Sequence, residues 1–370
     1  MQNIFAHFRS LDWILIGSSL GLAGIGLFSI YSSSIARNDF SNFEKQLIFL
    51  TLGFFAMLAI SFFDYRLLRN NSYFIVFLYL VGLIALTGLL IASVIPIPFA
   101  PEIRGTHRWY RIGGISIDPV EYVKLILVII VAKYFALRHV EVYRIRHIVF
   151  TGIYFLLPML LIAFQPDLGS LIMLASLWTI LLLVAGIRFR HLFALISLGI
   201  LLFAFAWSAF LLDYQKNRII SFIEPEFDPL GIGWSQEQAK IAIGNGGFFG
   251  KGFGQGTQTQ YGFLSEPQTD FIFSAIGEEF GFWGISLVFL FLMALVWRIL
   301  KIGIEAHNNF SRLYATGLAT LLIIQTIINV GMNLGFLPII GLSLPFVSYG
   351  GGMLIATYIG LGILLSIKTH

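Results

Sequence analysis

Long apolar runs separated by short polar segments dominate this chain of 370 residues. A bilayer core is crossed by about 20 consecutive, mostly apolar helical residues, and ten runs come close to that length. They cover residues 13–33, 47–63, 73–94, 119–137, 147–164, 168–187, 191–212, 271–297, 313–332 and 345–366. The pattern predicts an all-α polytopic membrane protein, a single domain over residues 1–370 with about ten transmembrane helices.

The overall composition agrees with that prediction. Hydrophobic residues make up 58% of the chain and charged residues only 11%, whereas about a quarter of the residues of a soluble domain are charged. The net charge of +4 is spread over short loops, so it indicates orientation in the membrane and no nucleic-acid partner. The chain has no cysteine, which excludes disulfides, iron–sulfur clusters and thiol catalysis.

Lysine and arginine accumulate in alternate loops. With the N-terminus inside, the inner segments carry most of these cations, including Arg66, Arg69 and Arg298, and the short outer loops carry few. Because cytoplasmic loops are the ones enriched in Lys and Arg, we expect both termini in the cytoplasm. The long segment 213–268, between the seventh and eighth spans, then lies outside as a folded loop that reaches the membrane surface.

The start of the fourth predicted span carries ionisable residues. Asp118 can cap this helix, and Pro119 suits its first position because the missing N–H has no partner there. Glu121 and Lys124, three residues apart, share one helix face. They have two interpretations: a capping box with a snorkelling lysine, or a polar cavity inside the protein, which the depth of Lys124 favours.

Acidic residues also surround the start of the eighth predicted span. Thr269 is a candidate N-cap that would place Asp270 in the first helical turn, where the helix dipole favours an ionised carboxylate. Glu278 and Glu279 follow within the same span, and charge at membrane depth requires a partner. We expect one of them to pair with an Arg or Lys of a neighbouring helix.

Three further segments contain residues that break helices. The glycine-rich residues 244–256 do not have the spacing of a phosphate-binding loop, so no nucleotide site is expected. Two interpretations of this segment remain: a flexible turn, or a contact to a lipid diphosphate through Lys251. Asp167 is expected to cap the sixth span. Residues 338–352, with two prolines and three consecutive glycines, must be buried in protein or line a wet cavity.

Taken in order, these motifs resemble the SEDS family (shape, elongation, division and sporulation), and within it the RodA type rather than the FtsW or SpoVE type. The matching elements are Arg108-Trp109, Pro119-x-Glu121-x-x-Lys124, Gln165-Pro-Asp167-Leu-Gly169, Tyr214-Gln-x-x-Arg218, Asp228-Pro-x-Gly231, Gln238-x-Lys240-x-Ala-Ile-Gly244, Gly256-Thr-Gln-x-Gln260, Phe263-Leu264, Thr269-Asp270-Phe-Ile-Phe273, Glu278-Glu279 and Leu344-Pro-x-x-Ser348-Tyr-Gly-Gly351. Each motif alone is weak, but the ordered set is specific and spans nearly the whole chain.

The resemblance implies a peptidoglycan glycosyltransferase that polymerises lipid II at the outer face of the bacterial inner membrane during cell elongation. It implies a growing glycan on undecaprenyl diphosphate as donor and a class B penicillin-binding protein as partner. Asp270 matches the family's essential acid. The resemblance places Glu121, Lys124, Arg108, Arg218, Lys240 and Ser348 at substrate-binding positions, and Asp167, Glu278, Glu279 and Pro119 at supporting ones. Gln268, Ser265 and Gly352 depart from the usual residues, but none of these changes touches Asp270.

Two roles remain open for Asp270. It can act as the general base for the sugar 4-hydroxyl, or it can hold a divalent cation, Mg or Mn, against the diphosphate leaving group. Two other functions compete with polymerisation: a flippase that moves lipid II across the bilayer, and a scaffold that only recruits a synthase. The position of Asp270 beside the long outer loop favours the enzyme.

Overall fold

The computed structural model describes residues 4–93, 95, 97–102, 106–113, 115–137, 145–224 and 231–370. Asp228 of the Asp228-Pro motif lies outside these residues. The helices are α1 (Ile4–Ser10), α2 (Trp13–Arg37), α3 (Ser41–Phe62), α4 (Arg66–Asn70), α5 (Ser72–Ala92), α6 (Pro119–Ala136), α7 (Ile145–Ala163), α8 (Leu168–Ala185), α9 (Phe189–Ala209), α10 (Asp213–Ile223), α11 (Ile232–Gly246), α12 (Thr257–Gln260), α13 (Ile272–Glu305), α14 (Asn309–Asn333) and α15 (Gly351–Thr369). Strands β1 (Tyr110–Ile112) and β2 (Ile115–Ile117) form an antiparallel pair in which Tyr110 faces Ile117.

Nine helices of the described chain are long and apolar enough to cross a membrane. The fourth predicted span corresponds to α6, which has 18 residues and carries Glu121, Lys124 and Lys133, so its length and composition alone do not mark it as a spanning helix. It nevertheless packs among the spanning helices, against α14, α5 and α15. The last predicted span starts too early, because residues 345–350 belong to the loop before α15.

Polar residues fix where several helices begin. The carboxylates of Asp12, Asp118 and Asp167 cap α2, α6 and α8 and accept hydrogen bonds from the first-turn amides of Leu15, Val120 and Ser170. Such caps satisfy N–H groups that have no partner inside the helix. The predicted caps at Asp118 and Asp167, with Pro119 in the first turn of α6, are therefore confirmed.

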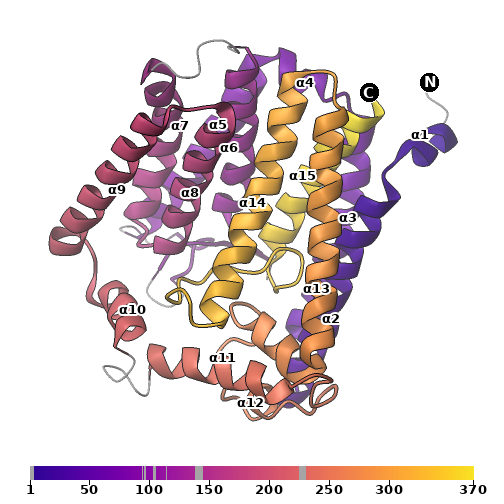
Figure 1. Cartoon of the computed structure of the whole chain (residues 1–370), viewed down its shortest axis with the longest axis vertical. Helices are drawn as coiled ribbons and strands as arrows, with labels where there is room; N and C mark the ends of the chain where they lie inside the picture. Colours follow the sequence, from indigo (N-terminus) through magenta and orange to yellow (C-terminus); the bar gives the residue numbers. More distant parts are fainter. Residues whose placement is uncertain are drawn as a thin grey trace.

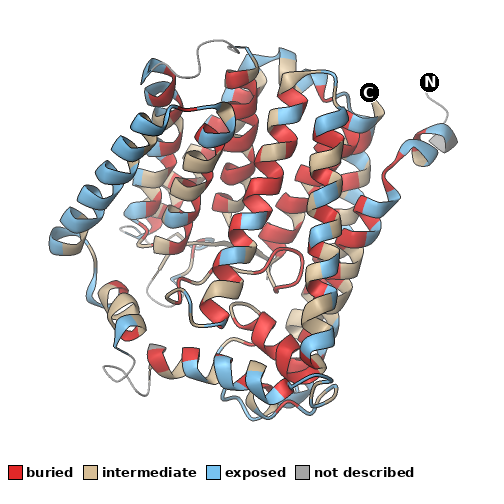
Figure 2. Cartoon of the chain, in the orientation of Figure 1, coloured by how far each residue is buried: buried red, intermediate tan, exposed pale blue. Residues whose placement is uncertain are grey.

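The core of the bundle forms around α15, which packs most extensively on α3 and also contacts α6, α14 and α13 (Figure 1). Buried residues are concentrated in these central helices, whereas α9 has no buried residue and stands at the outside (Figure 2). A helix that is apolar but exposed in the isolated chain suits contact with lipid.

The two ends of the bundle differ. Both termini lie at one end, and α10, α11 and α12 lie at the opposite end, where α11 runs across the bundle (Figure 1). At the terminus end, Asp12 is buried and forms ion pairs with Arg298 of α13 and, at 2.9 Å, with Lys368 of α15. These pairs tie the starts and ends of three distant helices together.

The helix α13 has a break at Gly281, where φ is +62° and ψ is −154°. This backbone conformation is essentially confined to glycine. The residues before the break form a short helical segment at the loop end, and the residues after it form the long membrane-spanning part. Glu278 and Glu279 precede the break, so the prediction that they lie inside a continuous span is wrong.

Replacing Gly281 by alanine should destabilise the protein by at least roughly 1–3 kcal/mol, the typical cost of such backbone strain. A Cβ at this position would also lie 2.3 Å from the backbone nitrogen of Gly250. The measurement is thermal unfolding of the purified protein. Gly199→Ala on α9 is the matched control, since a Cβ there meets nothing within 4 Å; equal melting temperatures for the two variants would contradict the assigned break.

Candidate active site

Asp270 lies in a turn that precedes α13 at the loop end of the bundle. The helix begins at Ile272, its N-cap position is Phe271, and no side chain caps it. The prediction that Thr269 caps this helix is therefore wrong. The physical reason is a local turn in which the amide of Phe271 donates to the carbonyl of Glu266 at 3.1 Å, which moves the helix start beyond Asp270.

The backbone around Asp270 is held by distant side chains and a distant amide. The carbonyl of Asp270 accepts from Nδ2 of Asn329 at 3.1 Å and from Nδ2 of Asn333 at 2.9 Å. The carbonyl of Thr269 accepts from Oγ of Ser348 at 2.7 Å.

The preceding carbonyl, that of Gln268, accepts from the amide of Tyr349 at 2.8 Å. Three consecutive carbonyls are thus bound by α14 and by the loop before α15. Because buried backbone groups need such partners, these contacts fix the direction from which the Asp270 side chain leaves the backbone.

The loop between α14 and α15 also borders the Asp270 carboxylate. Gly341 has a φ of +72°, and a Cβ there would lie 3.6 Å from Oδ2 of Asp270. The amide of Asn329 holds this loop as well, by donating to the carbonyl of Leu342 at 2.8 Å. One amide side chain therefore connects the loop to the segment that carries Asp270.

Charged side chains from four parts of the sequence, Asp270 included, interact around Arg108. Arg108 forms an ion pair with Asp167 at 2.7 Å, and its guanidinium lies over the ring of Trp109. Burial lowers the pKa of Arg108, but the neighbouring carboxylates, that of Asp167 first, followed by those of Asp118 and Asp270, raise it above its usual value. Arg108 is thus the cation that these acids share.

The second charge pair of this region lies in the first turns of α6. Nζ of Lys124 contacts Oε1 of Glu121 at 2.7 Å; the lysine side chain is fully buried, and that of the glutamate is 16% exposed. This contact agrees with the interpretation in which both residues point into the protein. Because of this burial, only Glu121 of the pair has an exposed surface.

Asp118 has an altered ionisation. Burial raises the pKa of its carboxyl to about 7, and Arg108 opposes that rise. Glu121 and Asp167 reinforce it, whereas Lys124 acts in the opposite direction. Desolvation thus favours the neutral form of Asp118 more than in an exposed carboxyl.

The amino-acid sequence matches a known protein family over almost the whole chain. Residues 12–370 match the sequence model of the FtsW/RodA/SpoVE family, described as cell cycle protein. The chain belongs to this family. The resemblance to SEDS proteins is thereby confirmed.

Two named relatives are similar to this chain over most of their length. The chain is 34% identical to a probable peptidoglycan glycosyltransferase FtsW of Trichlorobacter lovleyi, over 96% of this chain and 93% of that one. It is 38% identical to the peptidoglycan glycosyltransferase MrdB of Escherichia coli, over 72% of each.

Two solved structures share the fold. A peptidoglycan synthase complex that coordinates polymerisation and crosslinking superposes with a TM-score of 0.80 at 28% identity over 97% of both chains. An alanine variant of the rod shape determining protein RodA of Thermus thermophilus does so with a TM-score of 0.67 at 25% identity, also over 97% of both.

In this SEDS protein the paired acids Glu278 and Glu279 have neutral partners among the described residues. Glu278 accepts from the backbone amides of Gln258 at 2.7 Å and Thr259 at 2.9 Å, and from both threonine hydroxyls of α12. Glu279 accepts from Oγ of Ser32 at 2.6 Å and from Nε2 of Gln260 at 2.9 Å. The expected ion pair with an Arg or Lys does not form among the described residues, because α12 and Ser32 of α2 supply donors to both carboxylates.

Two other predicted substrate-binding residues, Arg218 and Lys240, lie on the helices of the loop end. Arg218 lies on α10 over the ring of Tyr214, on the side of the site that carries Arg108 and Asp167. Lys240 on α11 pairs with Glu237 at 2.5 Å, and its side chain passes Gly335 at the end of α14.

Ser348 is fully buried, accepts from the amide of Leu344 and donates to Thr269. These contacts make it a positioning residue of the Asp270 segment. Direct contact of Ser348 with substrate remains a prediction.

The glycine-rich residues 244–256 form a packed joint against the first part of α13. A Cβ at Gly246 would lie 1.9 Å from the carbonyl oxygen of Gly277, and one at Gly250 would lie 2.2 Å from that of Glu279. The amide of Lys251 donates to the carbonyl of Glu278 at 2.9 Å. These close contacts do not fit the flexible turn that the composition favours.

Asn329 and Asn333 are not among the site residues predicted from the sequence. They are four residues apart in α14 and fully buried, so they share one face of the helix. Asn329 lies inside the predicted span 313–332 and Asn333 directly follows it, which is a usable signal, since polar groups are costly at that depth. Their partner, a backbone carbonyl far away in the sequence, has no local signal.

Replacing Glu278 by glutamine should lower the stability by roughly 1–3 kcal/mol, because the new amide group would face donors where an oxygen now accepts. Thermal unfolding measures this loss. Glu237→Gln, an exposed glutamate of α11, is the matched control and should leave the melting temperature unchanged. If both variants melted alike, the acceptor role of Glu278 would be refuted.

Removing Arg108 should destabilise the protein by roughly 3 kcal/mol, because the buried carboxylate of Asp167 would lose its counter-charge. The double variant Arg108→Ala/Asp167→Asn should recover most of this loss, since asparagine still caps α8 without a charge. Melting temperatures of the wild type, the single and the double variant test this. A double variant no more stable than the single one would show that Arg108 acts by packing on Trp109 instead.

Proposed function

We propose that this SEDS protein is a RodA-type peptidoglycan glycosyltransferase that polymerises lipid II during cell elongation. The observation that carries the proposal is the fixed Asp270 beside the shared cation Arg108, at the end of the bundle where α10 to α12 lie. Relatives named as peptidoglycan glycosyltransferases support the reaction, and the ordered motifs support the RodA type.

The proposed orientation places the Asp270 end outside the bacterial inner membrane and both termini in the cytoplasm. Lys133, Arg298 and Lys368 belong to the terminus end of the bundle, together with Arg66 and Arg69 of α4. Cytoplasmic loops are enriched in such residues. The donor glycan and lipid II, both carried on lipid diphosphates, would then meet at the outer leaflet.

In the proposed reaction, the 4-hydroxyl of lipid II attacks the anomeric carbon of the growing glycan, and the bond to the undecaprenyl diphosphate breaks. A carboxylate oxygen of Asp270 takes the hydroxyl proton as general base. Arg108, with Arg218 nearby, neutralises the charge that develops on the leaving diphosphate. Lys124 acts through Glu121, whose orientation it fixes.

The alternative role of Asp270 is that of a ligand of Mg or Mn, a role that a single carboxylate can fill. No three His, Asp or Glu side chains converge as a metal cluster within the described residues. Mg²⁺, however, is commonly held by one or two carboxylates together with substrate phosphates and water. Asp270 would supply that carboxylate, and the ion would provide Lewis-acid stabilisation of the leaving group.

A class B penicillin-binding protein is the proposed partner. The support is the structural likeness to a peptidoglycan synthase complex that coordinates polymerisation and crosslinking. Polymer strands made at the outer face would be the substrate of such a crosslinking enzyme. No nucleotide is required, because the lipid diphosphate itself supplies the leaving group.

The experiment is lipid II polymerisation by purified protein, with and without the partner, comparing the wild type with Asp270→Asn. General-base catalysis contributes about 10²- to 10⁴-fold, so glycan formation should fall by at least about a hundredfold. Asp213→Asn, an exposed aspartate on α10 at the same end, is the control and should retain full activity. Full activity of a folded Asp270→Asn protein would remove Asp270 from the mechanism.

Chelation separates the two roles. If Asp270 is the general base, EDTA leaves the wild-type rate unchanged; if it holds the metal, EDTA abolishes polymerisation and added Mg or Mn restores it. A wild-type protein that makes no glycan under any of these conditions, but moves lipid II across vesicle membranes, would establish the flippase function instead.

A further inference from the structure

A cavity of about 370 Å³ opens at the terminus end of the bundle, far from Asp270. It lies between α4, the last turn of α6 and the start of α14. Its polar lining consists of three basic side chains and three amides: Arg69, Lys133, His307, Asn70, Asn308 and Asn309. No acidic side chain lines it among the described residues.

Lys133 is the unusual member of this lining. Its side chain is only 9% exposed, and Nζ donates to the carbonyl of Leu68 at a distance of 3.4 Å, which is long for a hydrogen bond. Within the described chain it forms no ion pair. Glu305, the acid nearest to His307 in the sequence, pairs with Lys301 instead, at 3.8 Å. A buried ammonium group without a counter-charge is costly, so the cavity favours an anion.

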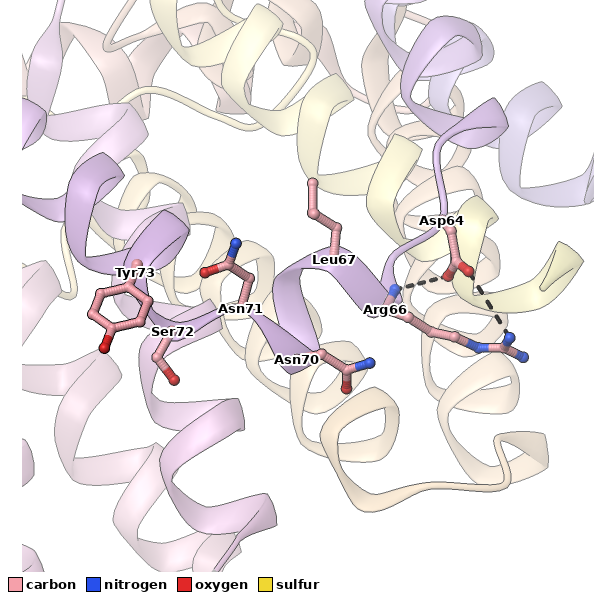
Figure 3. Close-up of a pocket in the computed structure, with 7 residues that line it drawn as sticks. All are labelled: Asp64, Arg66, Leu67, Asn70, Asn71, Ser72 and Tyr73. Atoms are coloured by element: carbon pink, nitrogen blue, oxygen red, sulfur yellow. Dashed lines mark hydrogen bonds and ion pairs between the residues drawn. The ribbon is translucent and has the colours of Figure 1, made fainter.

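A neighbouring cavity on the other side of α4 provides the contrast. It is larger, about 790 Å³, and its lining includes Asp64, Arg66 and Tyr73. Figure 3 shows the Arg66 side chain directed toward Asp64, with which it pairs at 3.9 Å, and away from Tyr73. The cation of that cavity is thus already balanced by a carboxylate, whereas no carboxylate among the described residues lines the smaller cavity.

We propose that the smaller cavity binds a phosphate group, supplied by the phosphodiester headgroup of an anionic membrane lipid. Basic pockets between helices at a membrane surface recognise such headgroups. Leu137 at the rim is 75% exposed, so a headgroup in the cavity would leave its acyl chains beside apolar surface. Free phosphate offers the same chemistry, and the experiment separates the two sources.

The experiment measures binding of dioleoyl phosphatidylglycerol to the purified full-length protein in neutral detergent by native mass spectrometry. Dioleoyl phosphatidylcholine is the uncharged comparison. Equilibrium dialysis with radiolabelled inorganic phosphate measures the free ion. The variants are Lys133→Gln and Arg69→Gln, and the matched control is Arg66→Gln, which removes the same charge from α4 but belongs to the neighbouring cavity.

We expect the wild type and Arg66→Gln to bind phosphatidylglycerol alike and in preference to phosphatidylcholine. Lys133→Gln and Arg69→Gln should each weaken binding by about tenfold or more, as expected for a lost hydrogen bond to a charged group. Phosphate binding that depends on Lys133, without such dependence for the lipid, would support the site with free phosphate as its ligand. Equal binding of lipid and of phosphate by all four proteins would overturn the proposal; if Lys133→Gln does not fold, Arg69→Gln decides.

Discussion

The anchoring of three consecutive backbone carbonyls by remote donors is the constraint on which the site depends. Backbone carbonyls away from water need hydrogen-bond donors, and the carbonyls of residues 268 to 270 receive theirs from other parts of the chain. Asn329 and Asn333 of α14, with Ser348 and Tyr349 of the following loop, provide them. The position of Asp270 is therefore set by residues that do no chemistry, and a carboxylate held in this way loses little entropy when it meets its substrate.

The same end of the molecule contains a second fixed joint. The break at Gly281 separates a short helical segment from the spanning part of α13, and the glycine-rich residues 244–256 pack into it. Glu278 and Glu279 close the joint by accepting hydrogen bonds from α12 and from Ser32 of α2. Two adjacent carboxylates can be buried here because they accept many hydrogen bonds, although none of these donors carries a charge.

Charge is distributed unequally between the two ends of the bundle. Near Asp270, four carboxylates share Arg108, and burial raises the pKa of one of them, Asp118. At the terminus end the balance reverses, and Lys133 is buried in a cavity lined by further cations. A protein that lies across a membrane meets a different environment on each side. At the Asp270 end the carboxylates surround Arg108, the cation that the proposed reaction uses to neutralise the leaving diphosphate. At the terminus end the basic cavity is proposed to bind the headgroup of an anionic lipid.

The sequence by itself determined what depends on near neighbours. Apolar run length predicted the spans, local polar residues predicted the caps at Asp118 and Asp167, and the ordered motifs identified the family and singled out Asp270. It failed where the deciding partner is remote: Ser32 and Glu279 are separated by 247 positions, and the amides that hold Asp270 lie about 60 residues beyond it. The break at Gly281, the neutral partners of Glu278 and the basic cavity were decided only by tertiary structure, because each arises from side chains that packing brings together.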